Sequence, residues 1–113
     1  MHETAIAKQT LDLALSSAKA AGAARILEIH MSIGALSGVV PNLLENALSE
    51  LARGTPAEGA LLRTQYVPPR LLCADCGQES EGIRGLYTCP FCGSAQIRLI
   101  GGSGYRIDDL LVE

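Results

Sequence analysis

Two short segments, Cys73-Ala74-Asp75-Cys76-Gly77 and Cys89-Pro90-Phe91-Cys92-Gly93, contain all four cysteines of the chain. Each segment is a Cys-x-x-Cys hook that lets two thiolates reach one ion, and twelve residues separate the hooks. This spacing is typical of a tetrahedral Zn²⁺ site. A glycine follows each hook, where the turn favours a residue that tolerates positive φ and where backbone N–H groups can point at sulfur. The sequence therefore predicts a zinc site with four ligands: Cys73, Cys76, Cys89 and Cys92.

Four cysteines at this spacing also allow other chemistry. Two disulfides would need an oxidising compartment, and the first residues of the chain do not have the pattern of a secretory signal. A dithiol redox pair would account for only one hook, whereas iron in a rubredoxin-like site fits four thiolates as zinc does. Because four cysteine ligands leave no open coordination position, we expect the metal to be structural and not catalytic.

The composition restricts the functions that this chain can have. Its 113 residues suffice for one small domain with a metal-bound insert, and with 4% aromatic residues the core must be aliphatic. The formal charge is −3, and four thiolates and one Zn²⁺ would change it by −4 and +2, to about −5. This acidic balance argues against nucleic-acid binding. Since no apolar run approaches the ~20 residues of a membrane span, we expect a cytoplasmic protein with no membrane partner.

Hydrophobic periodicity predicts a small α+β body around the cysteine segment. The expected elements are a helix at residues 4–21, a strand at 25–33, a helix at 41–54, a strand at 60–67 and a strand at 105–113. The last strand is too short to be stable alone, so it should pair with the two earlier strands. The predicted fold is therefore a three-stranded sheet with two helices, formed by residues 1–69 and 104–113, with a zinc-ribbon-like module inserted at residues 70–103.

Several positions inside these elements carry specific expectations. Leu13 falls on the apolar stripe of the first helix and should be buried in the core. His30 falls on the polar face of the first strand, where we expect a solvated side chain and not a metal ligand. The alternation of the last strand slips at Asp108-Asp109, which suggests a bulge. Pro68-Pro69 and Gly101–Gly104 flank the module, and this glycine-rich link suggests that the module moves relative to the body.

The first three residues, Met1-His2-Glu3, offer a set of nitrogen donors. The terminal amine of Met1, the amide nitrogen that joins Met1 to His2 and the imidazole Nδ1 of His2 can close a five- and a six-membered chelate ring. Such nitrogen sets favour square-planar Ni²⁺ or Cu²⁺. The first N–H groups of a helix have no intrahelical partner, so giving up such a proton to a metal breaks no helix hydrogen bond. Glu3 would offset the unfavourable effect of the helix dipole on a bound cation.

Taken together, these segments resemble the HypA/HybF family of nickel-insertion accessory proteins for [NiFe]-hydrogenase. The resemblance covers the whole chain in order. It rests on Met1-His2-Glu3, on Ile-Gly-Ala-Leu-Ser-Gly-Val at residues 33–39, on Arg-Gly-Thr at 53–55 with Ala-Glu-Gly-Ala at 57–60, and on the paired Cys-x-x-Cys-Gly hooks. One position departs from the family, whose members often carry an acidic residue before the proline of the second helix. This chain has Val40 there, so carboxylate support for nickel from that position is lost.

The resemblance implies a nickel metallochaperone, which carries a metal and is not an enzyme. It implies an α+β nickel domain and a separate zinc module, with Ni²⁺ as transient cargo bound by His2 and by the backbone nitrogens of His2 and Glu3. A HypB-type GTPase and the hydrogenase large subunit are the implied partners.

Two other functions compete with this interpretation. A zinc-ribbon module that binds a protein or a nucleic acid is the main alternative, with a local basic patch formed by Arg63, Arg70, Arg84, Arg98 and Arg106. The acidic balance and the scarcity of aromatic residues for base stacking argue against it. A zinc hydrolase would need an open metal position and a nearby general base, which a site of four thiolates does not provide.

Overall fold

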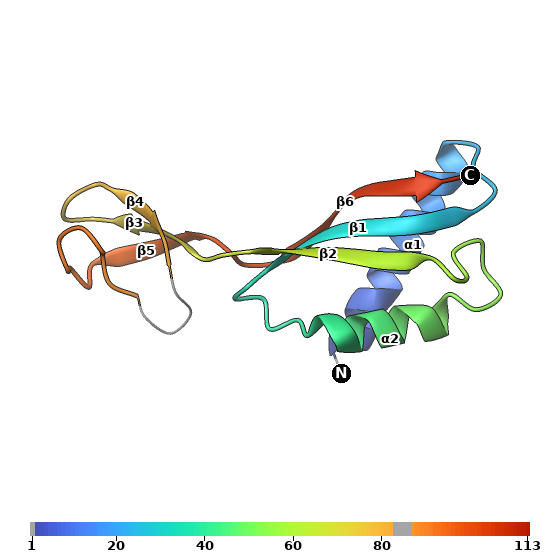
Figure 1. Ribbon diagram of the computed structural model, residues 1–113, viewed down its shortest axis with the longest axis horizontal. Coiled ribbons are helices and arrows are strands. Elements are labelled where there is room, and N and C mark those ends of the chain that lie inside the picture. The colour runs from blue at the N-terminus through green and yellow to red at the C-terminus, as the bar shows by residue number, and fades with distance from the viewer. Residues whose placement is uncertain (1, 83–86) are drawn as a thin grey trace. The chain divides into compact units, whose positions relative to one another are not determined.

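The structure is a computed structural model that describes residues 2–82 and 87–113 (Figure 1). The elements of this part of the chain are α1 (His2–Ala20), β1 (Ile26–Gly34), α2 (Pro41–Leu51), β2 (Leu61–Val67), β3 (Arg70–Cys73), β4 (Glu79–Glu81), β5 (Ile97–Gly101) and β6 (Tyr105–Val112). They include a three-stranded sheet of order β2-β1-β6 and another of order β4-β3-β5. The predicted α+β class, with two helices, a small sheet and an inserted cysteine module, is confirmed. Met1 and Arg84, which figured in the predictions, lie outside the described residues.

The chain divides into two compact units. The first comprises Met1–Ser32, Val39–Gln65 and Arg106–Glu113, and the second comprises Ile33–Gly38 and Tyr66–Tyr105. The first unit contains both helices, and the second contains the two cysteine hooks with the sheet β4-β3-β5. The described residues include no helix that is long and apolar enough to cross a membrane.

The core of the first unit follows from the periodicity of its elements. Ile29 and Met31 of β1 have the same parity, as predicted, and are almost completely buried. Leu44 and Leu48 of α2 lie one turn apart and are also buried. Burying one such side chain stabilises the fold by about 1.5–3 kcal/mol. Pro41 is the first residue of α2, where its missing N–H costs nothing, as the sequence predicts.

The prediction for Leu13 is wrong, because this side chain is 57% exposed. The residues of α1 that are buried lie on a stripe of positions that recur three or four residues apart: Glu3, Ile6, Ala7, Thr10, Leu11, Ala14 and Ala18. Leu13 lies to one side of this stripe. The apolar face predicted from the sequence pattern is broader than the buried face of α1. Packing against the sheet and α2 decides which flank of the helix is covered.

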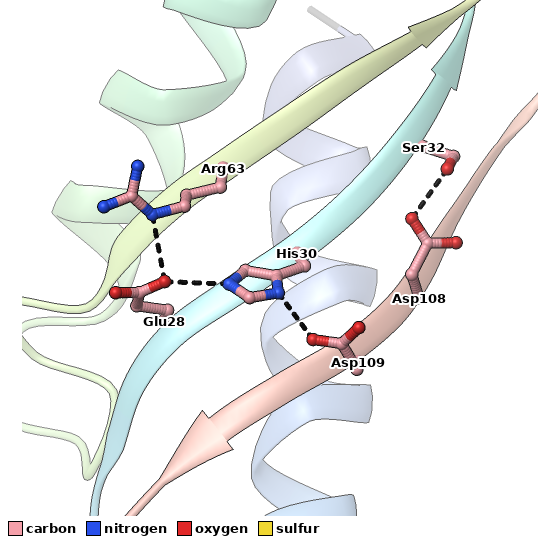
Figure 2. Close-up of polar contacts among 6 residues, drawn as sticks. All are labelled: Glu28, His30, Ser32, Arg63, Asp108 and Asp109. Carbon is pink, nitrogen blue, oxygen red and sulfur yellow. Dashed lines mark hydrogen bonds and ion pairs between the residues drawn. The ribbon is translucent and has the colours of Figure 1, made fainter.

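The strands of the first sheet are arranged with β1 in the middle. Figure 2 shows the arrows of β1 and β2 pointing the same way and that of β6 pointing the opposite way. Parallel neighbours need a crossover connection, and α2 lies between β1 and β2 in the chain. β6 runs antiparallel to β1, and the N–H of Glu113 donates to the carbonyl of Arg25 at 2.9 Å. Both helices lie behind the sheet in Figure 2, so the polar side chains drawn there occupy the opposite face.

A close backbone approach holds the segments of the second unit together. The N–H of Gly34 donates to the carbonyl of Gly104, and that of Leu36 donates to the carbonyl of Gly102, both at 2.8 Å. A Cβ on Gly34 would lie 2.3 Å from the carbonyl oxygen of Gly102, and one on Gly102 would lie 2.7 Å from Cα of Pro69. The glycine-rich link at residues 101–104 is therefore a packed part of this unit. Movement of the cysteine module relative to the α+β body stays a prediction.

Replacing Gly34 by Ala should lower the midpoint of thermal unfolding strongly, because the new Cβ meets backbone atoms that cannot rotate away. Overpacked sites typically lose about 1–3 kcal/mol, and we expect about 3 kcal/mol or more here. Gly38→Ala is the matched control in the same loop, since its Cβ would meet nothing within 4 Å. Only its left-handed backbone is strained, at a cost of about 1–2 kcal/mol. Calorimetry that finds both variants equally destabilised would contradict the close approach.

Candidate metal centre

The two hooks of the second unit bring their four thiols to one point. All four Sγ atoms lie within 4.8 Å of one another. Between the hooks, Sγ of Cys73 lies 3.6 Å from that of Cys92, and Sγ of Cys76 lies 3.6 Å from that of Cys89. All four cysteines are free. A tetrahedral zinc site with Zn–S distances of about 2.3 Å requires sulfur atoms about 3.8 Å apart, so this donor set fits the metal that the spacing predicts.

The same backbone turn closes both hooks. The N–H of Gly77 donates to the carbonyl of Cys73 at 2.9 Å, and the N–H of Gly93 donates to the carbonyl of Cys89 at 2.8 Å. Both glycines have a φ of +73°, which confirms the predicted left-handed turn. A residue with a Cβ would be strained there. The turn brings both cysteines of each hook to the same side, which lets them ligate one ion.

Backbone N–H groups also point at the sulfur atoms, as predicted. The N–H of Cys76 lies 3.5 Å from Sγ of Cys73, and the N–H of Phe91 lies 3.4 Å from Sγ of Cys89. Burial raises the pKa of the Cys89 thiol, but hydrogen bonds from the N–H groups of Cys92 and Phe91 outweigh burial and lower this pKa to about 7. The thiolate is the form that binds a metal, so these N–H groups favour the ligating state of Cys89. For Cys92 of the same hook, a hydrogen bond from the N–H of Ser94 lowers the thiol pKa, but hydrogen bonding with the Cys73 thiol and burial outweigh it and raise this pKa to about 12.

The sheet β4-β3-β5 supports the first hook but supplies little apolar core. Cys73 is the last residue of β3 and is buried, and its N–H donates to the carbonyl of Gln78. The hydroxyl of Ser94, which follows the second hook, donates to the carboxylate of Asp75 in the first hook. Leu71 is the one large side chain of β3, β4 and β5 that is fully buried. With so small an apolar core, a bound metal should contribute much of the stability of this unit.

His2 and Glu3, two of the three predicted nickel ligands, lie at the start of α1, in the first unit. The side chain of His2 is 58% exposed, whereas that of Glu3 is buried. Oε2 of Glu3 lies 3.4 Å from Nε2 of His2 and accepts a hydrogen bond from the N–H of Val40 at 3.3 Å. Val40 is the N-cap residue of α2. The structure therefore places the Glu3 carboxylate between His2 and the beginning of the second helix.

Several groups determine the charge state of Glu3. Burial raises the pKa of its carboxyl group, but hydrogen bonds from the N–H groups of Glu3 itself and of Val40, together with the nearby His2, outweigh burial and lower this pKa. Sequence reasoning considered only the backbone and the charge of Glu3 and missed this contact. A signal was present, because Glu3 precedes Ile6 and Thr10 by three and seven residues and so belongs to the buried stripe of α1.

The chain matches a known protein family along almost its whole length. A family model described as "HypA: Hydrogenase/urease nickel incorporation, metallochaperone, hypA" matches residues 1–112. The chain belongs to the HypA family. The predicted resemblance is thus confirmed, and with it the assignment to a family of metallochaperones for nickel incorporation.

Curated relatives support this membership, and two solved structures share the fold. The chain is 38% identical to the hydrogenase maturation factor HypA of Geobacter metallireducens, over all of both chains. It is 30% identical to the maturation factor HybF of Klebsiella pneumoniae, over 97% of each. The solution structure of the Ni metallochaperone HypA from Helicobacter pylori matches with a TM-score of 0.70 at 20% identity, over 97% of this chain and 96% of that one. Another solution structure of a HypA protein matches with a TM-score of 0.76 at 23% identity, over 100% and 97%. At these identities the two structures establish the fold.

The other histidine of this HypA-family chain lies on the polar face of β1, as predicted, but it is not simply solvated (Figure 2). Nε2 of His30 lies 2.8 Å from Oε1 of Glu28, and Nδ1 lies 2.5 Å from Oδ1 of Asp109. Nε of Arg63 donates to the same Glu28 oxygen at 2.9 Å. The two carboxylates face opposite edges of the ring, which suits an imidazolium that donates on both sides and not chelation of one ion. Asp108, the residue before Asp109, accepts a hydrogen bond from Ser32 of the same face of β1 at 2.6 Å, which is consistent with the irregularity predicted at Asp108-Asp109.

Stability should depend on the protonation of His30. The hydrogen bond to Glu28 raises the pKa of His30 above its ordinary value of 6.5. Burial lowers this pKa by a smaller amount, and the charge of Asp109 raises it further. The stabilisation by this cluster is therefore fully present below about pH 6.5 and is lost as the pH rises through the raised pKa. We expect the difference in unfolding midpoint between the native protein and His30→Gln to be largest near pH 6 and to shrink at higher pH.

The His30→Gln variant leaves the four cysteines unchanged, so the difference between the two proteins cancels any pH dependence that the cysteines contribute. The comparison should stay above pH 5, because the pKa of Glu28 is lowered by its hydrogen bonds to His30 and Arg63 and its contribution is lost in acid. A difference that grows between pH 6 and pH 9 would have the wrong sign for this cluster.

Proposed function

We propose that this HypA-family protein binds Ni²⁺ at its N-terminus and delivers it for [NiFe]-hydrogenase maturation. It acts as a carrier and not as an enzyme. Zn²⁺ held by Cys73, Cys76, Cys89 and Cys92 is structural: it cross-links the two hooks and undergoes no redox change. The observation that carries the nickel proposal is the buried Glu3 carboxylate beside Nε2 of His2.

This contact supports His2 as a ligand for a specific reason. An imidazole that binds a metal usually donates its other ring N–H to a carboxylate or a carbonyl, which fixes the ring and raises its basicity. In this chain Nε2 of His2 faces Glu3 at 3.4 Å, so Nδ1, on the other side of the ring, is the nitrogen that we assign to nickel. The terminal amine of Met1 and the backbone nitrogens of His2 and Glu3 complete the proposed nitrogen-rich set.

The Glu3 carboxylate also contacts the valine before the second helix. Where an acidic side chain is expected in relatives, this chain has Val40, and its N–H donates to Glu3. The carboxylate nearest the proposed site is therefore that of Glu3. It acts through His2 and through the start of α2, and we do not assign it as a ligand.

The chemistry of the cysteine site supports the proposed cellular location of the protein. Four free thiols around one metal position suit a reducing compartment, so we place the protein in the cytoplasm. A HypB-type GTPase and the hydrogenase large subunit are the proposed partners, with no nucleic acid. We further propose that residues 1–69 and 104–113 act as the nickel-binding domain and residues 70–103 as the zinc module.

Nickel titration of protein that begins at Met1 tests the proposal. We expect about one Ni²⁺ per chain, with the absorption of a planar nitrogen-rich site. A variant with one Gly added before Met1 should bind at least about tenfold more weakly, because the terminal amine becomes an amide and the chelate rings change. Its zinc content and circular dichroism should not change. Identical affinity and spectrum for both proteins would exclude the terminal amine.

A further inference from the structure

The two cysteine hooks are attached to the same pair of strands. The first hook begins at the last residue of β3, and the second hook is followed by β5, which pairs antiparallel with β3. Cys73 lies opposite Ile97 in this pair. One step further, the N–H of Ala74 donates to the carbonyl of Gln96 at 2.8 Å. The backbone therefore brings the start of the first hook beside the segment that leaves the second.

The residue two positions after each hook closes that hook through its backbone. In the second hook this residue is Ser94, whose carbonyl accepts from the N–H of Cys89 at 2.9 Å and whose N–H donates to Sγ of Cys92. Gln78 makes the same two contacts with the cysteines of the first hook. The backbones of the two hooks are thus equivalent.

The side chain of Ser94 reaches from the second hook to the first. Its Oγ accepts a hydrogen bond from the N–H of Gln96 at 2.9 Å, which directs the hydroxyl hydrogen away from β5. That hydrogen is donated to the carboxylate of Asp75, which lies between Cys73 and Cys76 in the sequence. A hydroxyl that both accepts and donates is held in one orientation. Ser94 therefore links the backbone before β5 to the middle of the first hook.

This link bears on the metal centre because apolar packing holds the hooks only weakly. Cys76 and Cys92 are exposed, and Leu71 is the one large, fully buried side chain of β3, β4 and β5. Twelve residues separate the hooks, and bringing the ends of such a loop together costs conformational entropy. Contacts that hold the hooks together before the metal arrives reduce the entropy that metal binding must offset.

We propose that Ser94 and Asp75 are positioning residues of the metal centre. Their hydrogen bond holds the two hooks face to face, so that the four thiols are in place for the metal, and neither residue is a ligand. The inference rests on the proposed function, which assigns structural zinc to the four cysteines, and it adds the side chains that keep these ligands in position.

Zinc affinity, measured on the whole reduced chain by competition with a chromophoric chelator, tests the role of Ser94. Ser94→Ala removes both contacts of the hydroxyl and should weaken zinc binding at least about tenfold, because loss of an outer-shell partner typically costs 10–100-fold. Ser94→Thr keeps a hydroxyl and should bind zinc as the native protein does. Ser80→Ala is the matched control, because Ser80 is a half-buried serine of β4 in the same unit, as Ser94 is half-buried after the second hook.

Changes at Asp75 separate the hydrogen bond from the negative charge. Asp75→Ala removes the acceptor and should weaken zinc binding, but less than Ser94→Ala does, because the contact between Ser94 and Gln96 remains. Asp75→Asn keeps an oxygen that can accept from the Ser94 hydroxyl, so it should bind zinc nearly as the native protein does. Equal losses in Asp75→Ala and Asp75→Asn would overturn the proposal and assign the effect to the carboxylate charge.

Co²⁺ in place of zinc provides a measurement that a general loss of stability would not change. The absorption of bound Co²⁺ reports the geometry of its four thiolate ligands. At saturating Co²⁺, Ser94→Ala should show shifted ligand-field bands, whereas Ser94→Thr and Ser80→Ala should show the native spectrum. A lowered affinity with an unchanged cobalt spectrum in Ser94→Ala would indicate a loss of stability alone and would overturn the proposal.

The native protein distinguishes failure of this inference from failure of the proposed zinc site. If the native chain binds neither zinc nor cobalt through its four thiolates, the assignment of the metal centre is wrong. If the native chain binds both metals and Ser94→Ala binds them with the same affinity and spectrum, the zinc site stands and the positioning role of Ser94 and Asp75 is wrong.

Discussion

Replacing Cys73 by Ser should unfold the second unit of the protein and leave the first unit folded. Cys73 ends β3, is buried, and contributes one of four Sγ atoms that lie within 4.8 Å of one another. A structural zinc site contributes on the order of 10–16 kcal/mol to the folding of a small module. Strands β3, β4 and β5 of this unit have Leu71 as their one large, fully buried side chain, so little apolar packing around the hooks remains when a ligand is lost. The first unit keeps its own aliphatic core around Ile29 and Leu44.

Elemental analysis together with amide spectra checks this prediction. The native protein should contain about one Zn per chain, the variant far less, and the amide signals of β3 and β5 should lose their dispersion while the helical circular dichroism remains. Asp75→Asn is the control, since Asp75 lies inside the first hook and is not a proposed ligand. Metal-free protein that keeps residues 70–103 resistant to protease would contradict the prediction, and iron in place of zinc would overturn the identity of the metal.

His2→Ala should reduce nickel affinity by more than about 100-fold, because it removes the only side-chain donor of the proposed chelate, whereas loss of an outer-shell partner typically costs 10–100-fold. Glu3→Gln should do less than the change at His2 or the added N-terminal residue. Gln keeps an oxygen that can accept from the N–H of Val40 and keeps the backbone nitrogen, but it loses the charge beside Nε2. Isothermal titration with the absorption spectrum of each nickel complex measures both effects.

The only other histidine provides the control for this experiment. His30→Ala should bind nickel as the native protein does, because both ring nitrogens of His30 face carboxylates of the first sheet. Zinc content should be the same in all three variants. If the His2→Ala protein takes up nickel with native affinity and an unchanged spectrum, the nickel site does not lie at the N-terminus.

Local physical chemistry explains what could be predicted for this HypA-family chain. Helices and strands were found because apolar residues recur with the period of each element, as Ile29 and Met31 do in β1. The cysteine cluster was found because two hooks and their turn glycines encode their geometry within a few residues. The Met-His-Glu start was interpreted from its donor atoms together with the family resemblance, and its role in nickel binding stays a prediction.

Contacts between residues far apart in the sequence were decided only by the tertiary structure. The pairing of His30 with Asp109, the burial of Glu3 against Val40 and the approach of Gly34 to Gly102 each join distant segments. No periodicity encodes such a contact, because it depends on which strands become neighbours and at what register. Leu13 shows the same limit, since its apolar side chain belongs to the helix pattern but the packing of α1 leaves it exposed beside β6. Thus sequence alone determined the two helices, the three strands of the first sheet and the four-thiol site, whereas the packing of the sheet determined which polar groups meet and which edge stays open.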